Sequence, residues 1–135
     1  MRKVMAFGTF DLIHPGHYYY LNNAKQLGDY LVVVVARDKN VLKAKGKKPE
    51  NNQETRLRKV EKTGIADEVI LGDENDPFLP IEKNKPSVIA LGYDQKPKEE
   101  ILKRELEKRG LKVEIVRIGA FGKDIYKSSK LRKQS

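Results

Sequence analysis

The sequence predicts an α/β domain built on a doubly wound, five-stranded parallel sheet. One observation is the run Tyr30–Ala36, which is apolar throughout and mostly β-branched. A run without polar alternation is typical of a strand that is covered on both faces. The other observation is that short apolar runs alternate with segments of helical spacing, as they do around a parallel sheet. No internal repeat or low-complexity linker interrupts the 135 residues, so we expect a single domain over residues 1–135.

The first strand and the first helix are delimited by glycine and proline. Lys3–Phe7 is a short apolar run that suits a buried strand and ends at Gly8. Pro15 fits the first position of the next helix, where its missing N–H would be unsatisfied in any residue. Gly28 then follows the helical spacing and predicts the end of that helix.

The middle of the chain contains one helix and one strand between polar segments. Residues 37–52 are lysine-rich and include glycine and proline, which predicts a loop. Gln53–Thr63 has helical spacing, and Glu68–Leu71 reads as the third strand. Gly72–Pro80 is rich in turn residues and predicts a link.

The last third of the chain supplies the two remaining strands. Ser87–Leu91 is the fourth strand, Lys98–Arg109 is a charged helix, and Lys112–Ile118 alternates as an edge strand would. Asp124–Lys133 is a short basic tail with a helical end. The expected strand order in the sheet is 3-2-1-4-5.

This order predicts where a ligand binds. In doubly wound sheets, ligands lie beyond the carboxyl ends of the strands, at the point where the winding reverses. With the order 3-2-1-4-5, that point is between the first and fourth strands. The segments Gly8–His17 and Gly92–Gln95 follow these two strands, so we expect them to face one crevice.

Composition and charge narrow the classes of function. The net charge is +9, which suits nucleic acid, an anionic membrane or small anionic substrates. The basic residues are spread along the chain instead of forming one face with stacking aromatic side chains, so we expect no nucleic-acid partner. No apolar run reaches the ~18–20 residues of a membrane span, and no signal-peptide pattern is present. The absence of cysteine excludes disulfides and thiolate metal sites. We expect a cytoplasmic protein with no membrane partner.

The segment Gly8–His17 holds both histidines of the chain. It lacks the glycine spacing of a dinucleotide-binding turn, and the chain has no Gly-x-x-x-x-Gly-Lys-Ser/Thr phosphate loop. His14 and His17 are three residues apart, which matches helical zinc pairs poorly. Two imidazoles and the N–H groups of a helix start would form a good receptor for a phosphoryl group. The alternative is structural: one histidine caps the helix and the other packs beneath Tyr18–Tyr20.

The motif Gly8-Thr9-Phe10-Asp11, followed by His14-Pro15-Gly16-His17, resembles the nucleotidyltransferases of the cytidylyltransferase family, with their His-x-Gly-His signature. The resemblance extends to Arg56, to the Gly-x-Asp after the fourth strand and to Ser128-Ser129-Lys130 near the end. It implies a Rossmann-like fold and transfer of a nucleoside monophosphate from CTP or ATP to a phosphorylated acceptor. Pyrophosphate would be released with the help of a divalent cation, Mg²⁺ first and Mn²⁺ or Co²⁺ as alternatives.

The resemblance also implies roles for particular residues. His14, His17 and Lys47 would be catalytic, and Lys45, Lys47 and Arg56 would receive the phosphate of the acceptor. The nucleotide would be bound by Thr9, Phe10, His14, Pro15, Gly16, His17, Asp94, Tyr126, Ser128 and Ser129.

Two positions leave alternatives open within the resemblance. Asp11 is the carboxylate expected to help with the metal, although a turn-forming aspartate is the equal alternative. Family members commonly carry an arginine shortly before the Ser/Thr pair, where this chain has Gly122–Lys127. Lys123 or Lys127 would supply the charge there, without the bidentate fork of arginine.

The acceptor is not fixed by the motif. Val33–Asn40 and Val88–Gln95 resemble the archaeal FAD synthases of this family, which favours transfer of AMP from ATP to FMN. The alternative is transfer of CMP from CTP to glycerol 3-phosphate, as in the bacterial glycerol-3-phosphate cytidylyltransferases. A nucleotide-binding or nucleic-acid-binding module without chemistry is the non-enzymatic alternative. The family is often dimeric, and Tyr18–Tyr20 are candidate interface residues for a homodimer.

Overall fold

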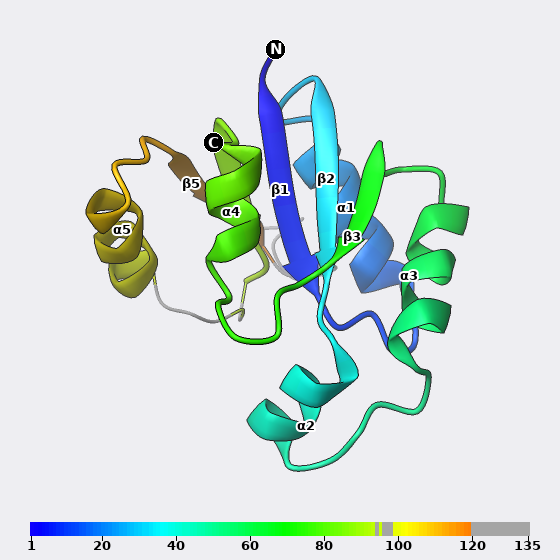
Figure 1. Cartoon of the computed structure of the whole chain (residues 1–135). Helices are drawn as coiled ribbons and strands as arrows, with labels where there is room; N and C mark the ends of the chain where they lie inside the picture. The colour runs from blue at the N-terminus through cyan, green and yellow to red at the C-terminus, as the bar shows by residue number, and fades with distance from the viewer. Residues whose placement is uncertain (94, 96–98, 120–135) are drawn as a thin grey trace.

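The computed structural model of the chain is an open parallel sheet with helices on both faces (Figure 1). The structure describes residues 1–93, 95 and 99–119. The strand order is β3-β2-β1-β4-β5, which confirms the predicted 3-2-1-4-5 arrangement. The strands are β1 (Lys3–Gly8), β2 (Tyr30–Val35), β3 (Glu68–Leu71), β4 (Val88–Leu91) and β5 (Glu114–Arg117).

The two central strands explain the apolar runs of the sequence. Strand β1 pairs in parallel with β2 over its whole length, from Lys3–Tyr30 to Gly8–Val35. On its other side β1 pairs with β4 over a shorter stretch, which ends at Ala6 opposite Ala90. Strand β5 pairs only with β4 and forms the edge, as its alternating pattern predicts.

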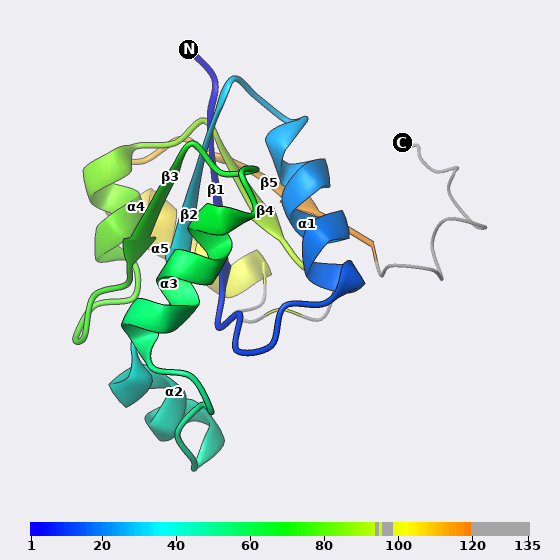
Figure 2. The same cartoon turned by 90° about the vertical axis from the view of Figure 1, so that its right-hand side faces the viewer.

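Helices cover both faces of the sheet (Figure 2). Helices α1 (Pro15–Lys25) and α3 (Gln53–Lys62) lie on one face, and α4 (Leu79–Asn84) and α5 (Glu99–Lys108) lie on the other. Successive residues of a strand point to opposite faces. Val4 and Ala6 therefore pack in the core beneath α1 and α3, whereas Met5 packs with Ile81, Leu102 and Leu106 on the opposite side.

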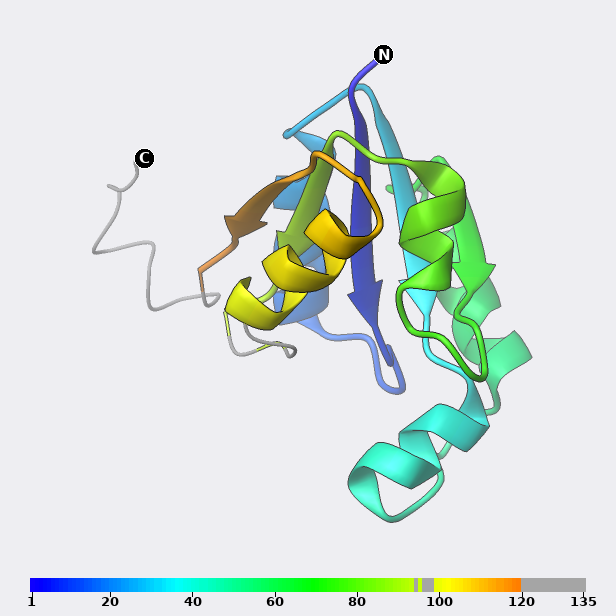
Figure 3. The ribbon, with the colours of Figure 1, turned by 60° about the vertical axis from the view of Figure 1, so that its left-hand side comes forward.

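The segment predicted as a loop over residues 37–52 contains helix α2 (Asp38–Lys45), so that prediction is wrong. This helix buries one residue, Val41, whereas Leu42 is exposed. Asp38, its first residue, is held by a side-chain pair with Arg56 of α3. Gly46 ends the helix with a left-handed φ of 80°. The helix projects past the carboxyl ends of the strands (Figure 3).

Helix α4 was also missed, because it begins within the predicted link. Leu79 and Pro80 open it, and Lys85 closes it in the left-handed conformation with φ of 46°. Both α2 and α4 are short, and their sequences lack the repeated apolar spacing by which longer helices are recognised.

Candidate active site

A large cavity lies at the carboxyl ends of the central strands, where the topology predicts a ligand. Its volume is about 1220 Å³. That exceeds the range of ~300–1,000 Å³ typical of one small-molecule site, so there is room for two substrates. Lining residues come from both sides of β1: Gly92, Tyr93 and Gln95 from the β4 side, and Arg37, Asn40, Gly72, Asp73 and Pro77 from the β2 and β3 side.

The turn after β1 lies between these two sides and has an unusual backbone. Phe10 has a positive φ of 55°, which is rare outside glycine, and its side chain is buried. The ring lies over Gly8, where an added Cβ would come within 2.6 Å of Phe10 Cε2. Gly8 is therefore required for close approach of the ring to the strand end. Thr9, Phe10 and Asp11 all line the cavity.

Each of the two histidines accepts a backbone hydrogen bond at the start of α1 through its own Nδ1. His14 is the N-cap, and its Nδ1 accepts a hydrogen bond from Gly16 N–H at 3.1 Å. His17 Nδ1 accepts in turn from His14 N–H at 3.2 Å. The two ring centroids are 3.9 Å apart with an angle of 31° between planes. His14 therefore caps the helix, as the structural alternative for this histidine pair predicts.

This capping has a chemical consequence. A backbone N–H can only donate, so Nδ1 of each imidazole carries no proton and each neutral ring holds its proton on Nε2. Both rings line the cavity, so their Nε2–H groups are donors available to a ligand. The N–H groups of Gly16 and His17 are already bonded to His14. The imidazoles, more than the backbone N–H groups expected from the sequence, are thus the donors of this turn.

Burial affects the charge of His17. Desolvation, with a smaller contribution from the nearby His14, lowers the pKa of His17 below its ordinary value of 6.5. Phe10 contributes to this environment, because its ring centroid lies 5.3 Å from that of His17. His17 is therefore a neutral hydrogen-bond donor at neutral pH.

Side chains of Tyr20 and Gln95 hold β1 and β4 apart where the cavity begins. The pairing of the two strands ends at Ala6–Ala90. Just beyond, the Tyr20 hydroxyl accepts from Phe7 N–H at 3.1 Å and donates to Ala90 O at 2.6 Å. Burial raises the pKa of Tyr20, so the hydroxyl keeps its proton.

Gln95 satisfies the next backbone groups of the same gap. Its Nε2 donates to Phe7 O, and its Oε1 accepts from Gly92 N–H at 2.9 Å. Arg117 of β5 donates to the carbonyl oxygens of Gly92 and Gln95 at 2.6 and 2.9 Å. The segment after β4 is thus fixed to β1 on one side and to β5 on the other.

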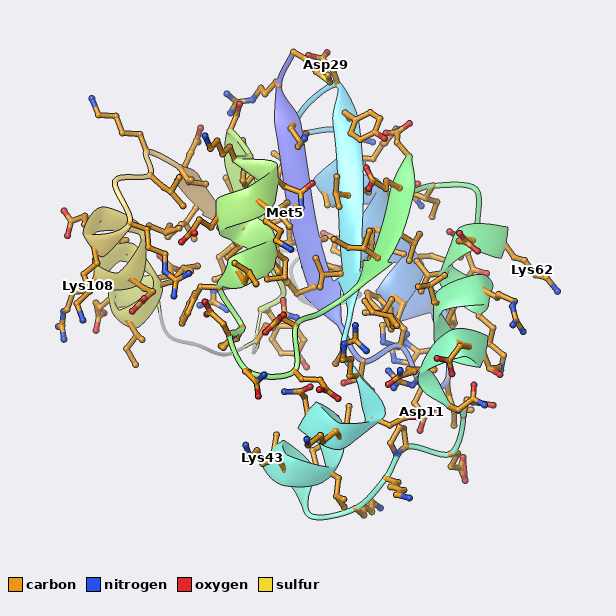
Figure 4. The ribbon with its side chains drawn as sticks, in the orientation of Figure 1. Met5, Asp11, Asp29, Lys43, Lys62 and Lys108 are labelled. Carbon is orange, nitrogen blue, oxygen red and sulfur yellow. The ribbon has the colours of Figure 1, made fainter. Side chains whose placement is uncertain are left out.

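Asp11 fastens the turn to the loop before α3. Its carboxylate accepts from the backbone N–H groups of Asn51 and Glu50, both at 2.8 Å. These bonds, with that from Asn51 the larger, lower the pKa of Asp11. Figure 4 shows Asp11 beyond the strand ends, between α2 and α3. This geometry favours the turn-forming alternative over a metal ligand.

Arg56 does not lie where the resemblance suggests. Its side chain is 0% exposed, and its guanidinium donates to Asn51 O, to Thr9 O and to Asp38 Oδ1 at 2.9, 2.8 and 2.7 Å. All three of these bonds are within the protein. The expectation that Arg56 contacts an acceptor phosphate is therefore wrong, and the side chain has a positioning role instead. Arg56 joins the catalytic turn to α2 and α3.

Lysines border the cavity on the α2 side. Lys45 lines the main cavity, and it also lines a smaller adjoining one of about 350 Å³ together with Lys47 and Lys48. Both predicted phosphate-binding lysines are exposed and therefore accessible. The structure brings them to the same end of the sheet as the histidines.

The remaining predicted site residues divide into two groups. Pro15 and Gly16 line the cavity at the start of α1. Asp94, Tyr126, Ser128 and Ser129 lie outside the described residues. Sequence reasoning missed Tyr20 and Arg37 and did not single out Asn40 as a site residue. The position of Arg37 and Asn40 just past the end of β2 is the signal that could have found them, because ligands lie at strand ends.

The resemblance implies a divalent cation, which calls for a look at the acidic and histidine side chains of the described residues. Among residues 1–93, 95 and 99–119, no group of three or more histidine, aspartate or glutamate side chains could hold a metal ion. Both carboxylate oxygens of Asp11 accept backbone N–H bonds instead. Mg²⁺ is usually held by one or two carboxylates together with substrate phosphates, so a cation here would depend on the bound nucleotide.

Comparison with known proteins identifies the family. The model of the family described as cytidylyltransferase-like matches residues 5–134. The chain belongs to this family. It is accordingly an enzyme, a nucleotidyltransferase, and not a binding module without chemistry.

Curated relatives of the nucleotidyltransferase include archaeal proteins named FAD synthase. One from Ferroglobus placidus is 62% identical over 89% of this chain and 78% of its own length. Another, from Archaeoglobus fulgidus, is 54% identical over 84% of this chain and 82% of its own. These relatives confirm the sequence-based assignment to the FAD synthase branch of the family.

A solved structure also resembles the nucleotidyltransferase over nearly its whole length. It is described as the lipopolysaccharide core biosynthesis protein from Thermoplasma volcanium, with 44% sequence identity and a TM-score of 0.85. The match covers 90% of this chain and 98% of that one. A search of the described residues for a helix long and apolar enough to cross a membrane finds none.

Proposed function

We propose that the enzyme transfers AMP from ATP to FMN, giving FAD and pyrophosphate. The observation that carries the reaction class is the histidine pair, whose two rings line the cavity and keep their Nε2–H groups free of the capping bonds. Similarity to archaeal FAD synthases supports FMN as the acceptor.

The two sides of the cavity suit the two substrates. ATP would occupy the side between β1 and β4, bordered by Gly92, Tyr93 and Gln95. FMN would occupy the side formed by the ends of β2 and β3, close to Lys45. The α-phosphate of ATP and the phosphate of FMN would then meet over the histidines. Thr9, Phe10, Pro15 and Gly16, which line the turn, would border the nucleotide.

The reaction requires positioning more than acid–base chemistry. An oxygen of the FMN phosphate attacks the α-phosphorus of ATP, and a new P–O bond forms. The bond from that phosphorus to the oxygen bridging the β-phosphate breaks, and pyrophosphate leaves with the electron pair. The attacking phosphate is already an anion, so no general base is needed. His14 and His17 donate from Nε2 to oxygens on which charge develops.

Lys45 and Lys47 would receive the FMN phosphate from the α2 side. Asp94, Tyr126, Ser128 and Ser129 would contact ATP. Mg²⁺, or Mn²⁺ or Co²⁺ in its place, would arrive bound to the triphosphate, where it neutralises phosphate charge.

The test is a four-way assay of ATP or CTP with FMN or glycerol 3-phosphate, following pyrophosphate and separating the products. ATP with FMN should give FAD and pyrophosphate in equal amounts. Turnover only with CTP and glycerol 3-phosphate would replace the acceptor and the nucleotide, and turnover with no pair would remove the proposal.

A further inference from the structure

Arg37 presents unused hydrogen-bond donors to the cavity. It follows β2 and precedes α2, and its Nε donates to the carbonyl oxygen of Gly72. This bond fixes the guanidinium at the ends of β2 and β3. Its two Nη groups have no partner among the residues that the structure describes, although Arg37 lines the cavity.

Asn40, which also lines the cavity, has an unused acceptor. Its Nδ2 donates to Glu74 O at 3.1 Å, which fixes the orientation of the side-chain amide. Its Oδ1 is buried and finds no hydrogen-bond partner in the described part of the chain. A buried polar atom without a partner is costly and calls for an explanation, such as a ligand that is absent from the structure.

The surroundings of this pair favour a neutral ring over another phosphate. The buried Val34 and the neighbouring Gly72 form an apolar floor at the strand ends, and Pro77 adds a flat wall. Asp73, next to Gly72, also lines the cavity, and its carboxylate accepts from backbone N–H groups of Asn75 and Asp76. These bonds lower the pKa of Asp73, so its negative charge opposes that of any anion here.

We infer that Arg37 and Asn40 recognise the dione edge of a flavin ring, and so select the acceptor. That edge presents a carbonyl, an N–H and a second carbonyl in a row. The Nη groups of Arg37 donate to a carbonyl, and Oδ1 of Asn40 accepts from the N3–H. The inference rests on the proposed function, because it takes FMN as the acceptor.

Two substitutions test the pair. Arg37→Lys keeps the charge but not the planar fork, and Asn40→Ala removes the acceptor oxygen. Each should raise the KM for FMN about tenfold, as expected for one lost hydrogen bond in a cavity, and leave the KM for ATP unchanged. Arg58→Lys and Asn22→Ala are matched controls, since both residues are exposed on helices away from the cavity lining, and neither should alter either KM.

An altered ligand tests the same contact on the unaltered protein. N3-methyl-FMN lacks the N–H, so its KM should exceed that of FMN by about tenfold. Asn40→Ala should use both acceptors equally well. Equal use of FMN and N3-methyl-FMN by the unaltered protein would overturn the inference, as would an Arg37→Lys effect on ATP instead of FMN.

Failure of the inference can be told from failure of the proposed function. FAD formation without discrimination against N3-methyl-FMN would overturn the inference alone. If no FAD forms and the fluorescence of FMN is not quenched on titration with the protein, both fail together.

Discussion

The hydroxyl of Tyr20 and the side-chain amide oxygen of Gln95 lie 3.3 Å apart in the gap where β1 and β4 separate. Between them these two side chains satisfy Phe7 N–H, Phe7 O, Ala90 O and Gly92 N–H. Backbone groups at the end of a sheet must find partners when buried. Here side chains provide them, and the crevice between the strands is open before any ligand binds.

Tyr20→Phe should therefore cost stability and nucleotide affinity together. The change leaves Phe7 N–H and Ala90 O without their partner, which should lower the free energy of unfolding by about 1–3 kcal/mol. Urea denaturation measures this, and the KM for ATP should rise more than that for FMN. Tyr18→Phe is the control, because Tyr18 is exposed on the same helix; equal effects from the two variants would contradict the account.

His14→Asn separates capping from catalysis. Asparagine is a good N-cap and keeps an acceptor near the position of Nδ1, so the free energy of unfolding should change little. It lacks the Nε2–H donor, so kcat should fall by ~10²–10³. His14→Ala should show the same loss of kcat and an additional loss of stability of about 1 kcal/mol. Near-normal turnover in His14→Asn would show that the Nε2–H of His14 does not act as a donor in the reaction.

The lowered pKa of His17 predicts a pH dependence of stability. Because the folded-state pKa lies below the ordinary value of 6.5, the unfolded chain binds more protons between the two values. The contribution of His17 to the free energy of unfolding should therefore be constant above pH ~6.5. Below that pH it should decrease as the pH falls toward the folded-state pKa.

The variant His17→Asn isolates this contribution. It should flatten the dependence of stability on pH between ~6.5 and the folded-state pKa, as followed by denaturation at a series of pH values. The carboxylates with lowered pKa, Asp11 and Asp73 among them, act in a separate and more acidic range. An unchanged slope in the variant would assign the effect to another group.

Arg56→Leu should be strongly destabilising. It leaves Asp38 without its partner and frees the carbonyl oxygens of Thr9 and Asn51. Breaking a buried pair from one side costs about 3–5 kcal/mol, measurable by denaturation. Arg58→Leu, two residues along the same helix and exposed, should stay within about 0.5 kcal/mol. A small effect at Arg56 would show that the turn is held by other contacts.

Lys47→Ala should raise the KM for a substrate while leaving kcat nearly unchanged. Lys47 lines the small cavity beside the main one, and its ammonium group would contact phosphate without taking part in bond breaking. Steady-state kinetics with each substrate varied in turn measures the effect. Lys43→Ala is a suitable control, since Lys43 is exposed on α2 (Figure 4) and belongs to neither cavity lining. If KM and kcat are both unchanged in Lys47→Ala, Lys47 is a solvated side chain that does not contact a substrate.

The strands and their order were predictable because they depend on local patterns. The apolar run of β2 and the glycine-ended run of β1 each signal a buried strand without reference to the rest of the chain. Helix α2 was not predictable in this way. Its first residue, Asp38, is held by Arg56 and Gln53, which lie well ahead in the sequence.

The site was partly predictable for the same reason. His14 and His17 lie three residues apart in one turn, so their proximity follows from local geometry. Arg56 was assigned to phosphate because its spacing in the sequence does not reveal that Thr9 and Asp38 surround it. Tyr20 and Gln95 meet across 75 positions of sequence, and only the folded sheet brings them together.

The most direct test of the central claim is a single-turnover reaction of excess enzyme with ATP labelled at the α-phosphate, in the presence of FMN and Mg²⁺. The label should appear in FAD at the rate at which pyrophosphate forms. His14→Asn and His17→Asn should slow this step by ~10²–10³ while ATP binding stays intact. Label that never reaches FAD, or a transfer step that is unchanged in both variants, would contradict the account.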